Sequence, residues 1–86
     1  MKIKENFLVH RSGEHCVMVA AGDSPFHGMI RLNRTAEFIV SCLREETTEE
    51  AVVDAVFGKY DAPRELIEKN VSDVLAKLRS VGALDE

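Results

Sequence analysis

Side chains able to do chemistry are few in this 86-residue chain, and their spacing does not form a reactive site. The histidines are His10, His15 and His27, and the cysteines are Cys16 and Cys42. A metal site is usually recognised by histidines four residues apart on a helix or by a Cys-x-x-Cys pair, and neither occurs. His15 and Cys16 are neighbours on a predicted strand, so their side chains should point to opposite faces. We therefore expect no catalytic residue, no metal site and no cofactor.

The two cysteines lie 26 residues apart and have no redox spacing, so we expect buried free thiols. The N-terminus meets charged residues too soon for a signal peptide, and no run of about 18 apolar residues could span a membrane. We expect a cytoplasmic protein without a membrane partner. Hydrophobic residues make up 45% and charged residues 30%, which is typical of one globular domain over residues 1–86.

The charge balance is acidic, with 11 Lys and Arg against 15 Asp and Glu and a net charge of −4. An acidic domain lacks the positive field that nucleic-acid binding requires. One acidic cluster is interpreted as the solvated start of a helix rather than a cation site; it comprises Glu45, Glu46, Glu49 and Glu50. No glycine-rich phosphate loop is present, because the glycines at 13, 22, 28, 58 and 82 are each expected at a turn or cap.

Three short strands are predicted in the first third of the chain. Residues 7–10 and 15–20 are apolar runs around a turn at 11–14, where Gly13 supplies the positive φ of a tight hairpin. Residues 21–28 collect Gly, Asp, Ser and Pro and predict a second, looser turn. Residues 29–32 then form the third strand. Its alternation places Ile30 and Leu32 on one face and Met29 and Arg31 on the other.

The first helix is expected to begin at Asn33, whose side chain is a good N-cap, with Thr35 as a competing cap. It continues to about Leu43, with an apolar face of Ala36, Ile39, Val40 and Leu43, widened by Phe38 and Cys42.

Two further helices follow. Thr47 and Glu50 have the spacing of a capping box for the second helix, which ends near residues 58–60. Its apolar residues are Val52, Val53, Val56 and Phe57. The third helix opens at residues 61–63 with Pro63 in its first turn and ends at Gly82. Its predicted buried stripe is Ile67, Val71, Val74, Leu78 and Val81.

The predicted fold class is α+β, with an N-terminal three-stranded antiparallel sheet followed by a three-helix bundle of the winged helix-turn-helix type. A DNA-binding regulator is one alternative function for such a bundle. The third helix argues against it, because its basic and acidic positions are interleaved and form no basic stripe.

The third strand is expected at an edge of the sheet, beside the helices. An unpaired edge must be protected or used. Its use would be β-augmentation, in which an extended peptide adds a strand and its alternate side chains enter a groove walled by a helix. A generic protein-interaction module, including a weak homodimer that pairs through this edge, is a further alternative to a monomeric peptide binder.

Four segments together resemble one known family. They are RLNRTAEFI at 31–39, TTEE at 47–50, NVSDVLAKL at 70–78 and GAL at 82–84. In this order and spacing they resemble the PqqD family, the coenzyme PQQ synthesis protein D family, also called the RiPP recognition element. The resemblance implies a non-catalytic protein that binds the leader of a ribosomally made precursor peptide. It also implies presentation of that peptide to a modifying enzyme, often a radical SAM protein.

In that family the leader docks as an extra strand on the third strand, against the last helix. Carried over to this chain, the resemblance implies a peptide-binding set of Met29, Ile30, Arg31, Leu32, Leu66, Asn70, Asp73, Val74 and Lys77. The chain departs from the family at Asn70, where an acidic residue is common, and at Val74, where an aromatic residue is common. These departures leave open which peptide is bound and which product is made.

Overall fold

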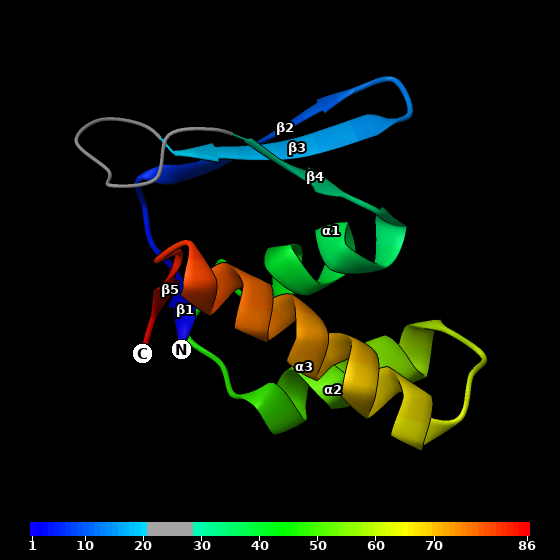
Figure 1. The fold of residues 1–86 in the computed structure, drawn as a ribbon. Helices are drawn as coiled ribbons and strands as arrows, with labels where there is room; N and C mark the ends of the chain where they lie inside the picture. Colours follow the sequence, from blue (N-terminus) through cyan, green and yellow to red (C-terminus); the bar gives the residue numbers. More distant parts are fainter. Residues whose placement is uncertain (21–28) are drawn as a thin grey trace.

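The structure is a computed structural model that describes residues 1–20 and 29–86. The predicted fold class is confirmed: three antiparallel strands precede three helices (Figure 1). The looser turn predicted at 21–28 lies outside the described residues. The elements are β1 (Lys2–Ile3), β2 (Phe7–Ser12), β3 (His15–Ala20), β4 (Met29–Leu32), α1 (Arg34–Cys42), α2 (Glu49–Lys59), α3 (Arg64–Ser80) and β5 (Leu84–Asp85).

The β2–β3 hairpin is longer than predicted. Pairing runs from Phe7 opposite Ala20 to Ser12 opposite His15, so the predicted end of the first strand at His10 is wrong. Only Gly13 and the residue after it remain in the loop. Gly13 has a φ of 62°, and a positive φ at the first of two loop residues is the pattern of a type II′ turn. The turn is therefore tighter than the polar sequence of residues 11–14 indicates.

β4 pairs antiparallel with β3, from Leu32 opposite Cys16 to Met29 opposite Val19. The strand order β2-β3-β4 places β4 at one edge, as predicted, and β2 at the other. The predicted alternation of β4 is also confirmed. Ile30 and Leu32 are buried, whereas Arg31 is exposed and Met29 is 66% exposed.

Asn33 joins β4 to α1, as predicted. Its side-chain Oδ1 accepts a hydrogen bond from the Ala36 amide at 2.7 Å, which makes Asn33 the N-cap and leaves Thr35 inside the helix. The predicted apolar face of α1 is buried, and Phe38 and Cys42 flank it half-buried.

The cap of α2 lies one residue later than predicted. Thr48 is the N-cap, and its Oγ1 accepts from the Ala51 amide at 3.1 Å. Thr47 is engaged with the chain terminus instead: its amide donates to the Met1 carbonyl at 3.0 Å and its own carbonyl accepts from the Met1 amine at 2.8 Å. Glu50 is therefore in the second helical position, and the predicted capping box does not form.

A small two-stranded sheet, β1–β5, was not predicted. Ile3 pairs with Leu84, and the Ile3 amide also donates to the Leu43 carbonyl at 2.8 Å. Strands of two residues are too short to show the alternation by which strands are recognised in a sequence. This sheet holds both termini beside the end of α1 (Figure 1).

The buried stripe of α3 is rotated from the predicted one. Leu75 is fully buried, whereas Val74 and Val81, which were predicted in the stripe, are half-buried. The four buried residues are Ile67, Val71, Leu75 and Leu78. The buried residues follow one another at four-residue steps from Ile67 to Val71 and from Val71 to Leu75. Because a helix has 3.6 residues per turn, these steps rotate the stripe slightly around the helix and place Leu75, not Val74, in the core.

Two details of α2 and the start of α3 also differ from prediction. Pro63 is the N-cap of α3 and not part of its first turn. Phe57 was predicted on the apolar face of α2 but is 45% exposed. The Arg64 guanidinium lies over its ring, with its central carbon 5.6 Å from the ring centre. This cation–π contact covers the ring without burying it.

α3 ends just before Gly82, the glycine predicted to stop it. The Gly82 amide donates to the Arg79 carbonyl at 3.0 Å and the Ala83 amide donates to the Leu78 carbonyl at 2.9 Å, which is a Schellman motif. Gly82 has a φ of 74°. Gly58, by contrast, was predicted at a turn or cap but lies within α2.

The two glycines give a matched pair of stability predictions. A Cβ added at either position meets no atom within 4 Å, so only backbone conformation matters. Gly82→Ala should lower the free energy of unfolding by about 1 kcal/mol, because a left-handed φ is unfavourable for residues with a Cβ. Gly58→Ala should raise it by about 0.5–1 kcal/mol, because alanine favours a helix interior. Urea unfolding measures both, and changes of the same sign would contradict the cap assignment.

Candidate functional site

β4 offers an unpaired backbone edge. Within the described strands its only partner is β3, so the backbone groups on its other side have no strand to bind. Such groups can accept an additional strand, because each is a strong donor or acceptor. Figure 1 shows β4 along the margin of the sheet, running straight into α1. The edge is short, and the Asn33 cap sets its end.

The side chains of β4 divide between the two faces of the sheet. Ile30 and Leu32 are buried among the helices and offer an incoming peptide little beyond their backbone. Met29 and Arg31 stand on the outer face, away from the helices. The Arg31 Nη2 lies 3.3 Å from Nδ1 of His15, a diagonal neighbour on β3, so the guanidinium is positioned across the sheet. The outer face therefore combines one apolar and one cationic side chain beside the edge.

The predicted residues of α3 lie along a single flank of that helix, next to its buried stripe. Leu66 is 49% exposed and Val74 is half-buried. Asn70, Asp73 and Lys77 are exposed. This flank cannot share a wall with Met29 and Arg31, which project from the opposite face of the sheet. The exposed and half-buried members of the predicted set thus form two separate groups, one of them Met29 and Arg31 on β4 and the other on the flank of α3.

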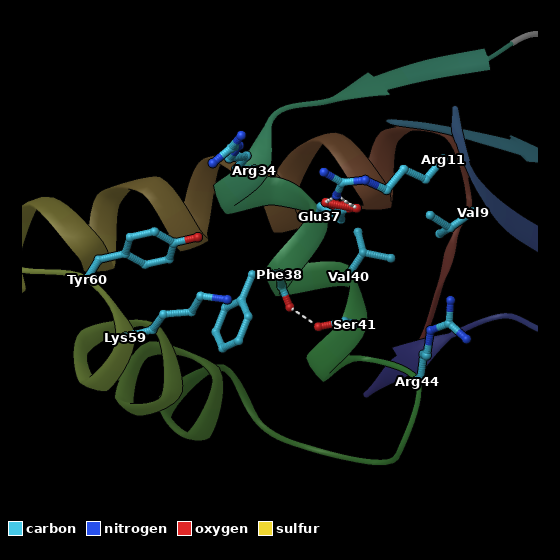
Figure 2. A pocket seen from close by; sticks show the side chains of 10 residues that line it. All are labelled: Val9, Arg11, Arg34, Glu37, Phe38, Val40, Ser41, Arg44, Lys59 and Tyr60. Atoms are coloured by element: carbon cyan, nitrogen blue, oxygen red, sulfur yellow. Dashed lines mark hydrogen bonds and ion pairs between the residues drawn. The ribbon is translucent and has the colours of Figure 1, made fainter. Parts of the chain in front are cut away.

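A hollow that sequence reasoning missed lies at the other edge of the sheet, between β2 and α1 (Figure 2). It encloses about 730 Å³ and is lined by Val9, Arg11, Arg34, Glu37, Phe38, Val40, Ser41, Arg44, Lys59 and Tyr60. A second hollow of about 420 Å³ adjoins it along β2 and shares Val9, Val40 and Arg44. The lining residues are scattered from β2 to the end of α2, so no local motif could have revealed them.

An ion pair closes one side of this hollow. Arg11 Nη1 donates to both carboxylate oxygens of Glu37, at 2.7 Å to Oε2. This bond from Arg11, aided by one from the Cys16 thiol, holds the pKa of Glu37 below its usual value. The pKa of Cys16 is raised, chiefly by burial and also by Glu37. A thiol with a raised pKa is a weak nucleophile, so this cluster has the character of a structural link.

The remaining chemistry-bearing residues are dispersed. Cys42 is half-buried, and burial raises the pKa of its thiol. His15 and Cys16 occupy opposite faces of β3, as predicted. Within residues 1–20 and 29–86, no three His, Cys, Asp or Glu side chains converge as a metal site would require. In the same part of the chain, no helix has the length and apolar character needed to cross a bilayer.

Fold and edge together define a class of protein: a winged-helix-like bundle preceded by a three-stranded sheet that has a free edge strand. The chain belongs to the PqqD family, since residues 14–84 match the family described as coenzyme PQQ synthesis protein D. This confirms the family indicated by the sequence motifs. No curated protein matches the chain.

Two solved structures share the fold. The first, "TbiB1 in Complex with the TbiA(beta) Leader Peptide", has a TM-score of 0.76 at 24% identity and covers 99% of this chain and 100% of that one. The second, "Lasso peptide synthetase B1 complexed with the leader peptide", has a TM-score of 0.76 at 18% identity and covers 95% of this chain and 93% of that one. At these identities the likeness establishes the three-dimensional arrangement of the chain.

The Arg11–Glu37 pair predicts an acid-sensitive contribution to stability. The folded state lowers the pKa of Glu37, so its carboxylate stabilises the fold above the ordinary value of 4.5. That contribution is lost as pH falls through the lowered pKa. Arg11→Met should raise the pKa of Glu37 toward 4.5, as measured by carbon-detected NMR titration of the side chain.

Arg79→Met is the matched control. It removes a second arginine–carboxylate pair, with Glu86, and should raise the pKa of that residue alone. If Glu37 titrates identically in the native protein and in Arg11→Met, Arg11 is not the main cause of the lowered pKa.

Proposed function

We propose that this protein is a non-catalytic peptide-binding protein that captures the leader of a ribosomally made precursor peptide by β-augmentation at β4. Membership of the PqqD family supports this function. So do the two solved structures of the same fold, TbiB1 and lasso peptide synthetase B1, each of which is a complex with a leader peptide. The observation that carries the proposal is the edge of β4, which is short, ends at a capped helix and pairs only with β3 among the described strands.

The leader backbone supplies most of the affinity. A strand added beside β4 forms main-chain hydrogen bonds with the unpaired edge, and these are independent of the leader sequence. Ile30 and Leu32 contribute through this backbone, because their side chains are already buried.

Side chains on both faces of the added strand supply specificity. Successive residues of a strand point to opposite faces. One set of leader side chains would lie on the outer face beside Met29 and Arg31. The other set would turn toward the helices and meet the flank of α3 formed by Leu66, Asn70, Asp73, Val74 and Lys77. An apolar residue and a cation occur in each group, so each can select a mixed apolar and acidic partner.

The charges of the edge bias the choice of leader. Arg31 and Lys77 favour acidic leader residues, whereas Asp73 disfavours them nearby. All three side chains are exposed. Their effect is therefore modest and is screened by salt, since the Debye length is about 8 Å at physiological ionic strength.

Presentation to a modifying enzyme completes the proposed role, with a radical SAM enzyme as the first class to test. The raised pKa values of Cys16 and Cys42 support a protein without a catalytic nucleophile of its own. A binding protein of this kind would work in the cytoplasm, where precursor peptides are made. The competing possibility is that a second copy of the chain pairs with β4 to form a homodimer. Light scattering with and without leader measures the molar mass and so distinguishes this dimer from a monomer that binds the leader.

NMR titration tests the docking strand. When an isotope-labelled sample is titrated with the leader encoded beside its gene, amide signals of residues 29–32 should shift most. Arg31→Glu should weaken binding of an acidic leader by about fivefold, which is close to 1 kcal/mol. The same variant should flatten the dependence of affinity on salt.

Arg44→Glu is the control for this measurement, because it makes the same charge change beneath the opposite edge of the sheet. It should leave leader affinity within twofold of that of the native protein. Unperturbed signals at residues 29–32 at saturating leader would refute docking at β4. Equal losses in both variants would mean that only net charge matters.

A further inference from the structure

The hollow beneath β2 concentrates positive charge in an acidic protein. Four of the 11 Lys and Arg residues line it, and Glu37 is the one carboxylate among its lining residues. Figure 2 shows that these cations come from different elements and surround the same space. They are Arg11 of β2, Arg34 at the start of α1, Arg44 just after α1, and Lys59 at the end of α2.

Among the described residues, three of the four cations form no ion pair. Arg11 is paired with Glu37, which satisfies one cation. In the described part of the chain, no carboxylate oxygen lies within 4.0 Å of a side-chain nitrogen of Arg34, Arg44 or Lys59, the distance that defines an ion pair. Cations gathered without carboxylates repel one another, so a bound anionic group would relieve that repulsion.

The floor of the hollow is apolar and aromatic. Val9 and Val40 form one part, and Phe38 and Tyr60 form the other. The two rings meet edge to face, with centres 6.2 Å apart and planes at 82°. Lys59 Nζ lies 4.5 Å from the centre of the Phe38 ring, which holds its charge over the floor. An apolar floor with a cationic rim suits a ligand that carries both apolar and acidic groups.

The shape is that of a groove along a strand. The adjoining hollow continues along β2 past Phe7 and Leu8, and Leu8 is 52% exposed. β2 is the second edge of the sheet, because the strand order is β2-β3-β4. An extended chain lying beside β2 would place alternate side chains over the floor and between the cations.

We propose that this β2 groove, between β2 and α1, binds an extended segment of a partner protein in which acidic residues alternate with apolar ones. It lies at the sheet edge opposite β4, so both edges can be occupied at once. The apolar floor favours a polypeptide, whose alternate side chains can be apolar, over a nucleic acid, which carries a charged phosphate at every nucleotide. The proposal stands whether or not β4 binds a leader peptide.

The test uses a short synthetic peptide in which Glu alternates with Leu and Phe, and a second peptide with Gln in place of every Glu. Titrated into the labelled full chain at low salt, the acidic peptide should shift amide signals of Val9, Arg11, Phe38 and Ser41. The Gln peptide should bind at least fivefold more weakly. The double variant Arg34→Glu/Arg44→Glu should weaken binding of the acidic peptide at least tenfold.

Lys69→Glu is the charge-reversal control away from the site, because Lys69 is exposed on α3 and lines neither hollow. It should leave the affinity unchanged within twofold. Urea unfolding of each variant verifies the fold. Arg44→Ala, which removes the cation without reversing its charge, should weaken binding about threefold and keeps the test valid if the double variant unfolds.

Several results would overturn the proposal. These are no binding at millimolar peptide, equal binding of the Gln peptide, or shifts at residues 29–32 instead of β2. The same shifts with inorganic phosphate or a short oligothymidylate at equal affinity would mean a site for anions in general. Peptide-reversible dimers in light scattering would mean that a second copy of this chain occupies the groove. Loss of leader binding at β4 alone would refute only the function proposed above.

Discussion

The arrangement of the sheet and the helices depends on the N-cap of α1, in which the Ala36 amide donates a hydrogen bond to the Asn33 side chain. This bond, at 2.7 Å, ends β4 and begins α1 within one residue. Because no loop intervenes, the direction of β4 determines where α1 starts beneath the sheet. The buried side chains of Ile30 and Leu32 then pack directly on the helices that follow. A longer connection would leave the edge of β4 free to move relative to the bundle.

The small sheet of β1 and β5 holds the other end of the molecule. The Ile3 amide donates to the carbonyl of Leu43, the C-cap of α1, and the Lys4 amide donates to the carbonyl of Ala83 after α3. The Met1 amine reaches Glu46 and the Thr47 carbonyl. The chain ends thus tie the exit of α1 to the exit of α3. Through these bonds the bundle keeps one arrangement beneath a sheet of only three strands.

The sheet has two edges, and their surroundings differ. β4 carries Met29 and Arg31 on its outer face, whereas β2 has a hollow with four cations beneath it. A three-stranded sheet cannot avoid two edges unless it closes into a barrel. In this chain both edges are open along the described strands, so one can take a leader peptide while the other takes a partner protein. A protein that presents one chain to another needs two such surfaces.

Local patterns in the sequence were enough to predict the order of the main strands and helices, the alternation in β4, the Asn33 cap and the glycine stop of α3. Each of these features depends on interactions between residues a few positions apart, so the local sequence is enough to predict it. The family motifs added the expectation of a peptide at β4. The cap of α2, the buried position of Leu75 and the exposure of Phe57 were mispredicted. Packing between distant segments decides them, as when Met1 engages Thr47 and shifts the cap by one residue.

The β1–β5 sheet and the β2 groove could be found only in three dimensions. The sheet joins the first and last residues of the chain, and its strands are too short to leave a pattern. The groove gathers Arg11, Arg34, Arg44 and Lys59 from four places that are unremarkable in sequence. A net charge of −4 even predicts the opposite sign for an average surface. Charge at a site depends on which side chains the fold brings together, and a sum over the sequence does not contain that information.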